Sequence, residues 1–290
     1  MGWQEINFEK YVAEIKKKFK VSIADEIIKK DLILTFILAE LEKAGLGKEL
    51  IFKGGTLLSR NYLKYHRFSE DLDFVYKDSG FLSGLTRNQR EKKIKQFIDL
   101  FTPKLKEVAD ALGLDFSTDR SDIKFCKILH GRTVYTFKVY YSKIQFIKIE
   151  INFIEKIVDK TLEVSVGAIT DFFDSKRLMS DLNLSYSNFQ VQSYSLKEIT
   201  LEKYRATLTR NKLQERDLFD LFLIKDSLKV DINEIIEKIK NSSLIKRDLT
   251  KLIGEKLEPI VSYDLKEFEE FKERIKPILI EICKNFLSSL

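Results

Sequence analysis

The sequence has few of the residues that bind structural zinc, form disulfides or interrupt regular structure. Its 290 residues include only 2 cysteines, 2 histidines, 3 prolines and 11 glycines. Cys126 and Cys283 lie far apart without a C-x-x-C pair, so we expect no structural zinc site. The low glycine and proline content excludes collagen-like and low-complexity chains.

Long apolar runs are also missing. The most hydrophobic stretches, such as residues 32–39, fall well short of the ~18–20 residues that cross a bilayer. The N-terminus lacks the cationic start and apolar core of a signal peptide. We therefore expect no membrane span and a location in the cytoplasm. No sequence period repeats, which excludes a solenoid.

The patterns that are present predict two domains. Hydrophobic residues make up 44% of the chain and charged residues 33%, so it can form a core. Helical and strand-like periodicities alternate in the first part, at residues 7–20, 25–45, 50–52, 72–75, 86–111, 123–129, 133–140 and 144–153. After a polar stretch at 186–195 only helical signals remain. We predict an α+β fold with a mixed sheet in residues 1–190 and a helical domain in residues 191–290.

Short local signals support these boundaries. Ser195 with Glu198, and Asp231 with Glu234, have the spacing of a helix capping box. His130-Gly131 favours a hairpin turn between two of the predicted strands. Four or five helices are expected after residue 195.

The most informative stretch is a strand that ends in Lys53-Gly54-Gly55-Thr56 and continues as a helix. Glycines at a helix start leave backbone N–H groups unhindered, which predicts a cradle for phosphate. A tight turn is the simpler explanation of a Gly-Gly pair taken alone. Asp71 and Asp73 follow on the next strand, where alternation sends both carboxylates to one face.

Two carboxylates at this spacing repel each other unless a cation lies between them. Mg²⁺ is the expected cation, because carboxylate and phosphate oxygens complete its coordination. A third carboxylate would form a two-metal site for phosphoryl transfer. Glu150, which alternates with Lys148 on a later strand, is the natural candidate. The alternative is a solvated acid that balances the charge of Lys148.

Two patterns in the helical part are also candidates for this chemistry. Lys203, Thr207 and Arg210 share one helix face, and Arg216 precedes Asp217 and Asp220. A cation and a hydroxyl beside a triphosphate would offset charge on the leaving pyrophosphate. The spacing alone favours an ordinary solvated helix face.

The positive charge of the chain is concentrated between residues 120 and 148. This segment holds seven basic residues against one acid, Asp122, and carries +6. Aromatic residues lie between the cations, a combination that suits a polynucleotide backbone and unstacked bases. We predict that RNA is bound by Arg120, Lys124, Lys127, Arg132 and Lys138. The alternative is the wet face of an ordinary sheet.

At these residues the chain resembles the AbiEii/AbiGii toxin family of nucleotidyltransferases, the toxins of bacterial type IV toxin–antitoxin and abortive-infection systems. The MenT toxins of mycobacteria are similar. The resemblance rests on four blocks, Phe52-Lys-Gly-Gly-Thr-Leu-Leu-Ser, His66-Arg-Phe-Ser-Glu-Asp-Leu-Asp-Phe, Lys203-x-x-x-Thr207 and Arg216-Asp-Leu-Phe-Asp. It implies a polymerase-β-like nucleotidyltransferase fold whose C-terminal helical domain closes a cleft over the nucleotide.

The resemblance also implies roles for individual residues. Gly54, Gly55 and Thr56 would hold the triphosphate of the NTP, with Ser69 beside it. Asp71 and Asp73 would bind Mg²⁺, and Lys203 would contact the phosphates. Thr207 and Arg210 are added as nucleotide-binding candidates by their spacing from Lys203 on the helix. The third carboxylate is Glu150, Asp217 or Asp220, and spacing does not separate these choices.

The reaction implied is Mg²⁺-dependent transfer of a nucleoside monophosphate from an NTP to RNA, in the first place the 3′ end of tRNA. Such a toxin would stop translation and growth, and a cognate antitoxin would restrain it. We expect a monomer. One alternative is a nucleotidyltransferase for small molecules such as antibiotics. Another is an inactive homologue that only binds RNA or a protein. Residues 230–290 match no motif.

Overall fold

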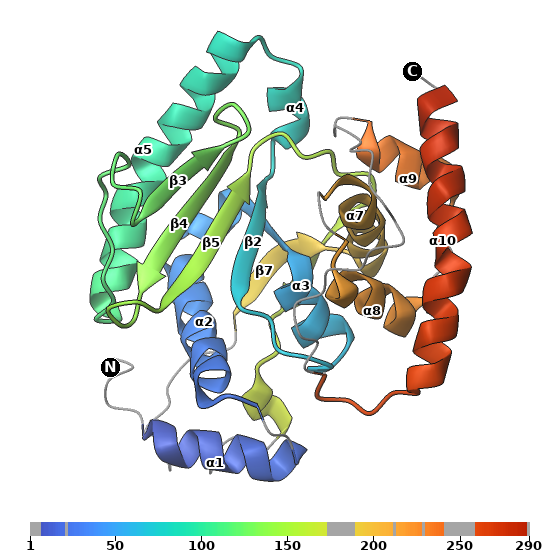
Figure 1. Ribbon diagram of the computed structural model, residues 1–290. Coiled ribbons are helices and arrows are strands. Elements are labelled where there is room, and N and C mark those ends of the chain that lie inside the picture. Colours follow the sequence, from blue (N-terminus) through green and yellow to red (C-terminus); the bar gives the residue numbers. More distant parts are fainter. Residues whose placement is uncertain are drawn as a thin grey trace. The chain divides into compact units, whose positions relative to one another are not determined.

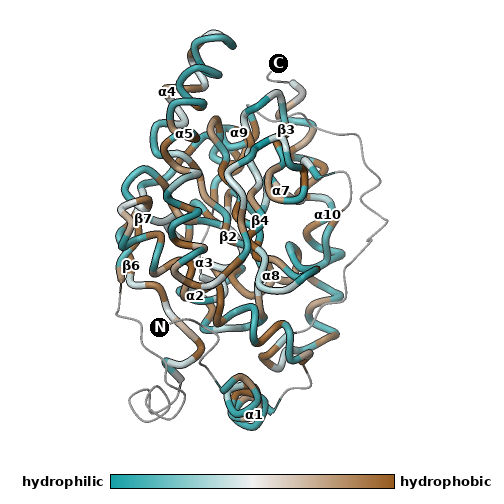
Figure 2. Tube along the Cα trace, turned by 90° about the vertical axis from the view of Figure 1, so that its left-hand side faces the viewer, coloured by the Kyte–Doolittle hydropathy of each residue, from teal (hydrophilic) through white to brown (hydrophobic). Residues whose placement is uncertain are grey.

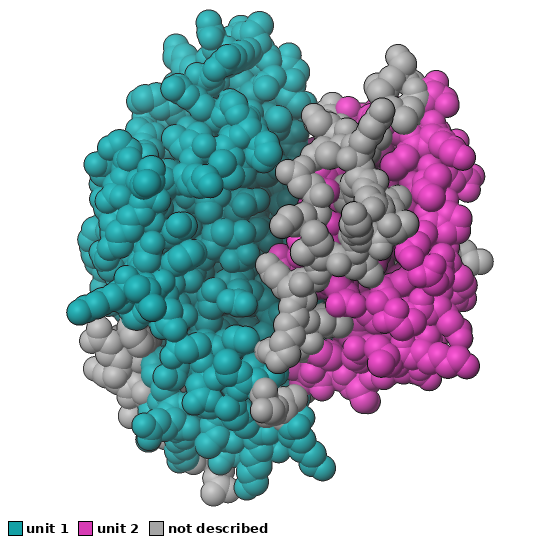
Figure 3. Space-filling model, in the orientation of Figure 1, with its two compact units in different colours: residues 1–155, 161–193 teal, residues 156–160, 194–290 magenta. Residues whose placement is uncertain are grey.

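The computed structural model describes residues 7–20, 23–172, 189–210, 213–227, 230–240 and 259–288. The chain divides into two compact units, which Figure 3 shows in different colours. Unit 1 consists of Met1–Glu155 and Thr161–Ser193, and unit 2 of Lys156–Lys160 and Tyr194–Leu290. A mixed sheet lies in unit 1 and a group of helices in unit 2 (Figure 1). The predicted α+β fold with a mixed sheet is confirmed.

The sheet has seven strands within the described residues, in the order β3-β4-β5-β2-β1-β7-β6. Its strands are β1 Leu50–Lys53, β2 Asp71–Tyr76, β3 Cys126–Leu129, β4 Val134–Tyr140, β5 Phe146–Asn152, β6 Thr161–Ser165 and β7 Gln190–Tyr194. β1 pairs antiparallel with β2 but parallel with β7, and β2 pairs parallel with β5. The central strands therefore run in both directions, which makes the sheet mixed.

Helices cover one face of this sheet. Those of unit 1 are α1 Phe8–Phe19, α2 Asp25–Lys43, α3 Gly54–Leu57, α4 Ser79–Ser83 and α5 Arg87–Ala111, with a π-helical turn η3 at Leu58–Tyr62 and 3₁₀ turns η2 at Leu46–Glu49 and η4 at Ile169–Phe172. Rings of Phe97 and Phe101 on α5 contact Phe153 and Phe137. In Figure 1, α2 lies behind the strands. The core of unit 1 lies between these helices and the sheet.

Alternation along β5 separates this core from the other face. Ile147, Ile149 and Ile151 are buried toward the helices, whereas Lys148 and Glu150 are half-buried on the opposite side. β2 follows the same rule, with Leu72 and Phe74 in the core and Asp71 and Asp73 facing away. The acids therefore share one sheet face, as predicted.

Two strand predictions need correction. β3 begins at Cys126 rather than Ile123, because a turn at Asp122 accepts N–H groups of Phe125 and Cys126. β6 and β7 are short strands of five residues with two apolar residues each, and the sequence analysis did not predict them. The turn at His130-Gly131 is confirmed, with φ values of 49° and 61°.

Unit 2 contains α7 Leu196–Thr209, α8 Glu215–Ile224, α9 Ile232–Ile239 and α10 Leu265–Ser288. Rings on α8 and α10 pack together in its core, for example Phe222 against Phe268. The capping box of Asp231 and Glu234 is confirmed. The other box is half formed. Ser195 caps the N–H of Glu198, but the Glu198 carboxylate binds the N–H groups of Val158 and Asp159.

Figure 2 shows the long helix α5 mainly in the hydrophilic colour. No helix within the described residues is long and apolar enough to span a membrane.

Candidate active site

The strand register brings three acids and a lysine together on one face of the sheet. Asp73 on β2 is the direct partner of Glu150 on β5, and Asp71 is the partner of Lys148. The side chains of Asp71, Glu150 and Lys148 are 33%, 33% and 31% exposed. We call this side of the sheet the acid-bearing face, because Asp71, Asp73 and Glu150 all lie on it. The predicted grouping of Glu150 with the two aspartates is thus seen in the structure.

Lys148 supplies positive charge to this group of acids. Its Nζ lies 2.8 Å from Asp71 Oδ2 and 3.8 Å from Glu150 Oε2. Burial acts to lower the pKa of Lys148, but the carboxylates of Asp71 and Asp73 outweigh it and raise the pKa above its ordinary value. The ammonium group therefore stays charged, and it partly offsets the repulsion that the sequence assigned to a metal ion.

Glu150 differs from a solvated surface acid. Burial raises its pKa, and the neighbouring Asp73 carboxylate raises it further, while Lys148 and Lys53 oppose the shift. The carboxylate is thus crowded by negative charge and poorly hydrated. A group in this environment gains from a divalent cation more than a fully solvated acid does.

The two glycines allow the chain to approach this face closely. Gly54 has a φ of 84°, and a Cβ added to it would lie 2.3 Å from Asp73 Oδ2. A Cβ on Gly55 would lie 2.9 Å from Arg67 Nη2 and 3.1 Å from Ser69 Oγ. Glycine is therefore needed at both positions. Ser69 lies beside the glycine turn, and its expected position next to a triphosphate stays a prediction.

Thr56 has a structural contact in addition to its predicted role. Its side chain is buried, and its hydroxyl donates to the carbonyl oxygen of Asp71 at 2.5 Å. This bond joins the start of α3 to the start of β2, so it holds the glycine turn against the acids. A phosphate at this turn would meet backbone N–H groups rather than the Thr56 hydroxyl.

The helical segment after the glycines is anchored by a buried ion pair that the sequence did not reveal. Arg60 Nη2 lies 2.7 Å from Asp31 Oδ1, and the Tyr65 hydroxyl donates to Asp31 Oδ2 at 3.1 Å. Burial raises the pKa of Asp31, although Arg60 opposes the shift. The pair fixes η3 against α2, and with it the direction in which α3 points.

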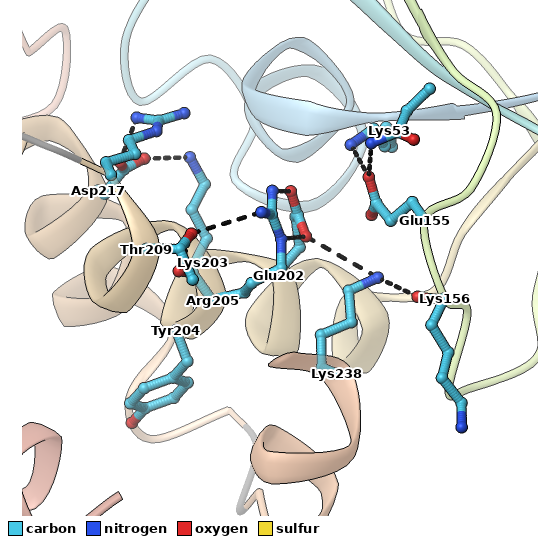
Figure 4. A network of polar contacts seen from close by, with 12 residues as sticks. Lys53, Glu155, Lys156, Glu202, Lys203, Tyr204, Arg205, Thr209, Asp217 and Lys238 are labelled. Carbon is cyan, nitrogen blue, oxygen red and sulfur yellow. Dashed lines mark hydrogen bonds and ion pairs between the residues drawn. The ribbon is translucent and has the colours of Figure 1, made fainter. Parts of the chain in front are cut away.

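Lys53 and Arg67 are two further basic residues that sequence reasoning missed. Lys53 is the cross-strand partner of Asp73 and forms a buried ion pair with Glu155 (Figure 4). Arg67 is buried next to Gly55, and its Nη1 donates to the Phe68 carbonyl at 3.0 Å. Lys53 lies in the first of the four quoted sequence blocks, directly before Gly54, and Arg67 lies in the second, four residues before Asp71. Their position in those blocks was the available signal.

The donors on the acid-bearing face fit Mg²⁺ chemically. Within the described residues, no three His, Cys, Asp or Glu side chains are clustered tightly enough to form a metal site. The available ligands are nevertheless hard carboxylate oxygens, partly exposed and crowded by like charge. Mg²⁺ takes such ligands and completes its shell with water and substrate phosphate.

The predicted residues of the helical part form a separate network within unit 2. Lys203 Nζ lies 2.9 Å from Asp217 Oδ1 (Figure 4). It also lies 2.7 Å from Asp220 Oδ2, and Arg210 pairs with Asp217 as well. Lys203, Asp217 and Asp220 are 7%, 1% and 0% exposed. The expectation of an ordinary solvated helix face is wrong, because the helix turns Lys203 and Thr207 inward. The Thr207 hydroxyl donates to the Tyr204 carbonyl at 2.7 Å.

The basic residues of segment 120–148 lie on different parts of unit 1. Cross-strand pairing places Lys127 in the row of Glu150 and Lys138 beside Lys148, so both lie on the acid-bearing face. The other three predicted residues are paired with acids elsewhere, Arg120 with Asp99, Lys124 with Asp115 and Arg132 with Glu91.

The aromatic part of the RNA-binding prediction is wrong for most of the rings. Phe125, Tyr135, Phe137 and Tyr140 are buried, and their rings pack against other rings of unit 1. Buried rings offer no surface on which bases can stack. The cations of this segment, rather than its aromatic residues, are the part that can contact a polynucleotide.

Comparison with known proteins gives a consistent result. The family model described as "Nucleotidyl transferase AbiEii toxin, Type IV TA system" matches residues 37–283. Among solved structures, the nucleotidyltransferase toxin MenT4 from Mycobacterium tuberculosis is similar, with a TM-score of 0.52 and 14% sequence identity over 95% of this chain and 98% of that one. A comparison with curated protein sequences gives no match. The family match extends to residue 283 and so covers most of residues 230–290, where no motif was recognised.

Proposed function

The chain belongs to the AbiEii family of nucleotidyl transferase toxins from type IV toxin–antitoxin systems, and we propose that it transfers a nucleoside monophosphate from an NTP to the 3′ end of tRNA. The observation that carries this proposal is the register of β2 and β5, which places Asp71, Asp73 and Glu150 on one face beside the Gly54-Gly55 turn. Carboxylates next to a glycine cradle are what a metal-dependent transfer from a triphosphate requires.

Each group has a distinct task in this proposal. The N–H groups at the start of α3 bind the triphosphate, and Asp71, Asp73 and Glu150 hold Mg²⁺. Bound Mg²⁺ supplies a Lewis acid that stabilises charge on the phosphoryl oxygens. The 3′ oxygen of the RNA forms a bond to the α-phosphorus, the bond to the β-phosphate oxygen breaks, and pyrophosphate leaves. Asp73 or Glu150 accepts the proton of the attacking hydroxyl.

The burial of the acids in unit 2 favours Glu150 as the third carboxylate. Asp217 and Asp220 are buried and paired with Lys203, so their oxygens already have a cationic partner. We propose that they hold Lys203 in position, and that Lys203, with Thr207 and Arg210, contacts the β and γ phosphates of the NTP. Compensation of that charge is the main task of a protein in phosphoryl transfer.

Lysines on the acid-bearing face support an anionic acceptor. Lys127 and Lys138 share this face with the acids, and they would contact phosphates of the RNA next to its reacting end. The same charges repel a cationic acceptor such as an aminoglycoside, which makes the antibiotic-type alternative less favourable. We also propose that the protein acts in the cytoplasm as a monomer, and that a cognate antitoxin binds it.

The test is incubation of purified protein with Mg²⁺, total bacterial tRNA and each α-labelled NTP in turn. We expect label on tRNA with the wild-type protein and none with Asp71→Asn. The labelled NTP then identifies the nucleotide that is transferred.

Three results would separate the proposal from its alternatives. Label on a small molecule but not on RNA would favour the antibiotic-type enzyme. Salt-sensitive RNA binding without turnover of any NTP would favour an inactive homologue. Equal labelling by Asp71→Asn would refute the assignment of the acids.

A further inference from the structure

A hollow with basic walls lies at the β3 edge of the sheet, on the face that α5 covers. We call it the basic hollow. Its volume is about 450 Å³, and its lining residues are Glu91, Lys92, Lys95, Arg120, Ile128, Arg132 and Tyr135. Ile128 and Tyr135 are cross-strand partners on β3 and β4. The four basic side chains come from α5, from the loop before β3 and from the β3–β4 turn.

The charge of the basic hollow is positive even though it contains ion pairs. Its lining carries four cations and one acid, a formal +3, and Asp99, which pairs with Lys95 and Arg120, lowers this to +2. Lys92 has no carboxylate partner among the described residues. Arg132 is 66% exposed and makes one contact, with Glu91 at 3.3 Å. Most of its guanidinium donors therefore face solvent.

The arrangement fits an extended, hydrated polyanion better than a small anion. The cations are spread over three chain segments, and the side chains of Lys95 and Arg132 are largely exposed. The adjoining first half of α5 is basic as well, with five Lys or Arg and one acid between Arg87 and Gln96, and Figure 2 shows it mainly in the hydrophilic colour. A row of exposed cations attracts successive phosphates along a backbone.

The basic hollow is separate from the reacting groups. β4 and β5 lie between β3 and β2, so about 14 Å separates the edge strand from Asp71 and Asp73 at ~4.8 Å for each strand spacing. The hollow also opens on the opposite face of the sheet. An RNA whose 3′ end lies at the acids reaches it only with a segment several nucleotides away from that end.

We propose that the basic hollow binds the phosphodiester backbone of the RNA acceptor at a distance from its reacting 3′ end. This inference rests on the proposed function. It implies that the enzyme selects a folded or long RNA over a short one ending in the same nucleotides. The affinity for RNA then comes from two separate contacts, one at the acids and one at the basic hollow. The contact at the hollow contributes nothing to the chemical step.

The test uses Lys92→Gln/Lys95→Gln, with Lys266→Gln/Lys284→Gln on α10 as a control of equal charge change. All four lysines are exposed, so folding should be unaffected. Binding of full-length tRNA is measured without NTP at several salt concentrations. We expect about tenfold weaker binding for the α5 variant, and a salt dependence reduced by about 1 to 2 phosphate contacts. The α10 control should match the wild type.

Transfer assays complete the test. The KM for tRNA should rise about tenfold in the α5 variant, while the KM for a trinucleotide with the same 3′ end stays within about twofold. Unchanged tRNA binding, or an equal loss in the α10 control, would overturn the inference. If the α5 variant binds tRNA as the wild type does but no longer binds polyglutamate, the inference is also overturned, and the hollow is assigned to an acidic protein.

The outcomes distinguish this inference from the proposed function. If the wild-type protein labels no RNA, the proposed function fails, whatever the variants bind. If it labels tRNA and the α5 variant has the wild-type KM, only the basic hollow fails.

Discussion

The acid-bearing face of unit 1 and the Lys203 network of unit 2 use the same residue types in opposite electrostatic states. On the acid-bearing face, Asp71, Asp73 and Glu150 lie with Lys148, while Lys53 beside Asp73 is already paired with Glu155. About a third of the side-chain surface is exposed for Asp71, Glu150 and Lys148. In unit 2 two acids, Asp217 and Asp220, face two cations, Lys203 and Arg210, and both acids are fully buried. The first group has a formal charge of −2 and the second is neutral.

This difference separates a site that can exchange ligands from one that holds its shape. Binding of a cation lowers the free energy of a partly hydrated group of carboxylates whose negative charge is not fully neutralised. A neutral, buried group of charges destabilises the fold when any partner is removed, because the remaining charge is left without compensation. Substitution of an acid should therefore affect chemistry in unit 1 and folding in unit 2.

The largest expected effect is that of Asp73→Asn on activity. Loss of this carboxylate should reduce NMP transfer about a thousandfold or more, since it removes a metal ligand and a candidate base. Stability should change by less than about 1 kcal/mol, because removing one acid also relieves repulsion with Glu150. Single-turnover kinetics and thermal unfolding measure the two quantities. Activity near the wild-type level would contradict the role of this face.

The matched change in unit 2, Asp220→Asn, should act mainly on folding. It removes one of the two carboxylates that pair with the buried Lys203, and the other, Asp217, is shared with the exposed Arg210, so we expect a loss of about 3 kcal/mol in the free energy of unfolding. Urea denaturation measures this loss, and Lys203→Met in the same background should restore part of it. A stable, inactive Asp220→Asn protein would instead place Asp220 in the chemistry.

The contrast between the acid-bearing face and the Lys203 network also explains which features of the structure could be predicted from the sequence. Alternation placed Asp71 and Asp73 on one face correctly, because it depends on local geometry that the order of residues encodes. Glu150 was a candidate third carboxylate, and its position opposite Asp73 comes from the register of β2 with β5. The pairing of Lys148 with Asp71 depends on the parallel register of β2 with β5, which joins segments more than 70 residues apart. Lys203 was expected on a solvated face, since helical spacing defines a face but not what packs against it. The burial of Phe125 and Phe137 escaped prediction for the same reason.

A smaller effect is expected from Gly54→Ala. The added Cβ would lie 2.3 Å from Asp73 Oδ2 at a φ of 84°, so the Asp73 carboxylate must move. A displacement of about 1 Å costs on the order of a hundredfold in rate. Gly131→Ala is the control, because its φ is also positive but a Cβ there meets nothing within 4 Å. It should cost about 1–2 kcal/mol of stability and leave transfer unchanged. Equal activity losses in both variants would attribute the effect to backbone strain alone.

The smallest expected effect concerns Lys148, the cation that partly offsets the repulsion among the carboxylates of the acid-bearing face. Lys148→Met removes an ammonium 2.8 Å from Asp71 and preserves the length of the side chain. The metal-free protein should lose about 1 kcal/mol of stability, whereas Mg²⁺ should bind about tenfold more tightly, because lysine no longer competes for Asp71.

Calorimetric titration with Mg²⁺ and thermal unfolding with and without Mg²⁺ test this prediction independently of turnover. Lys138→Met is the control, since Lys138 lies beside Lys148 on the same face but contacts the Phe146 ring rather than an acid. Tighter Mg²⁺ binding in Lys148→Met alone would show that the group in unit 1 exchanges one cation for another. Weaker binding would instead make Lys148 a support of the metal ligands, and the two regions would then differ in burial but not in the role of their lysines.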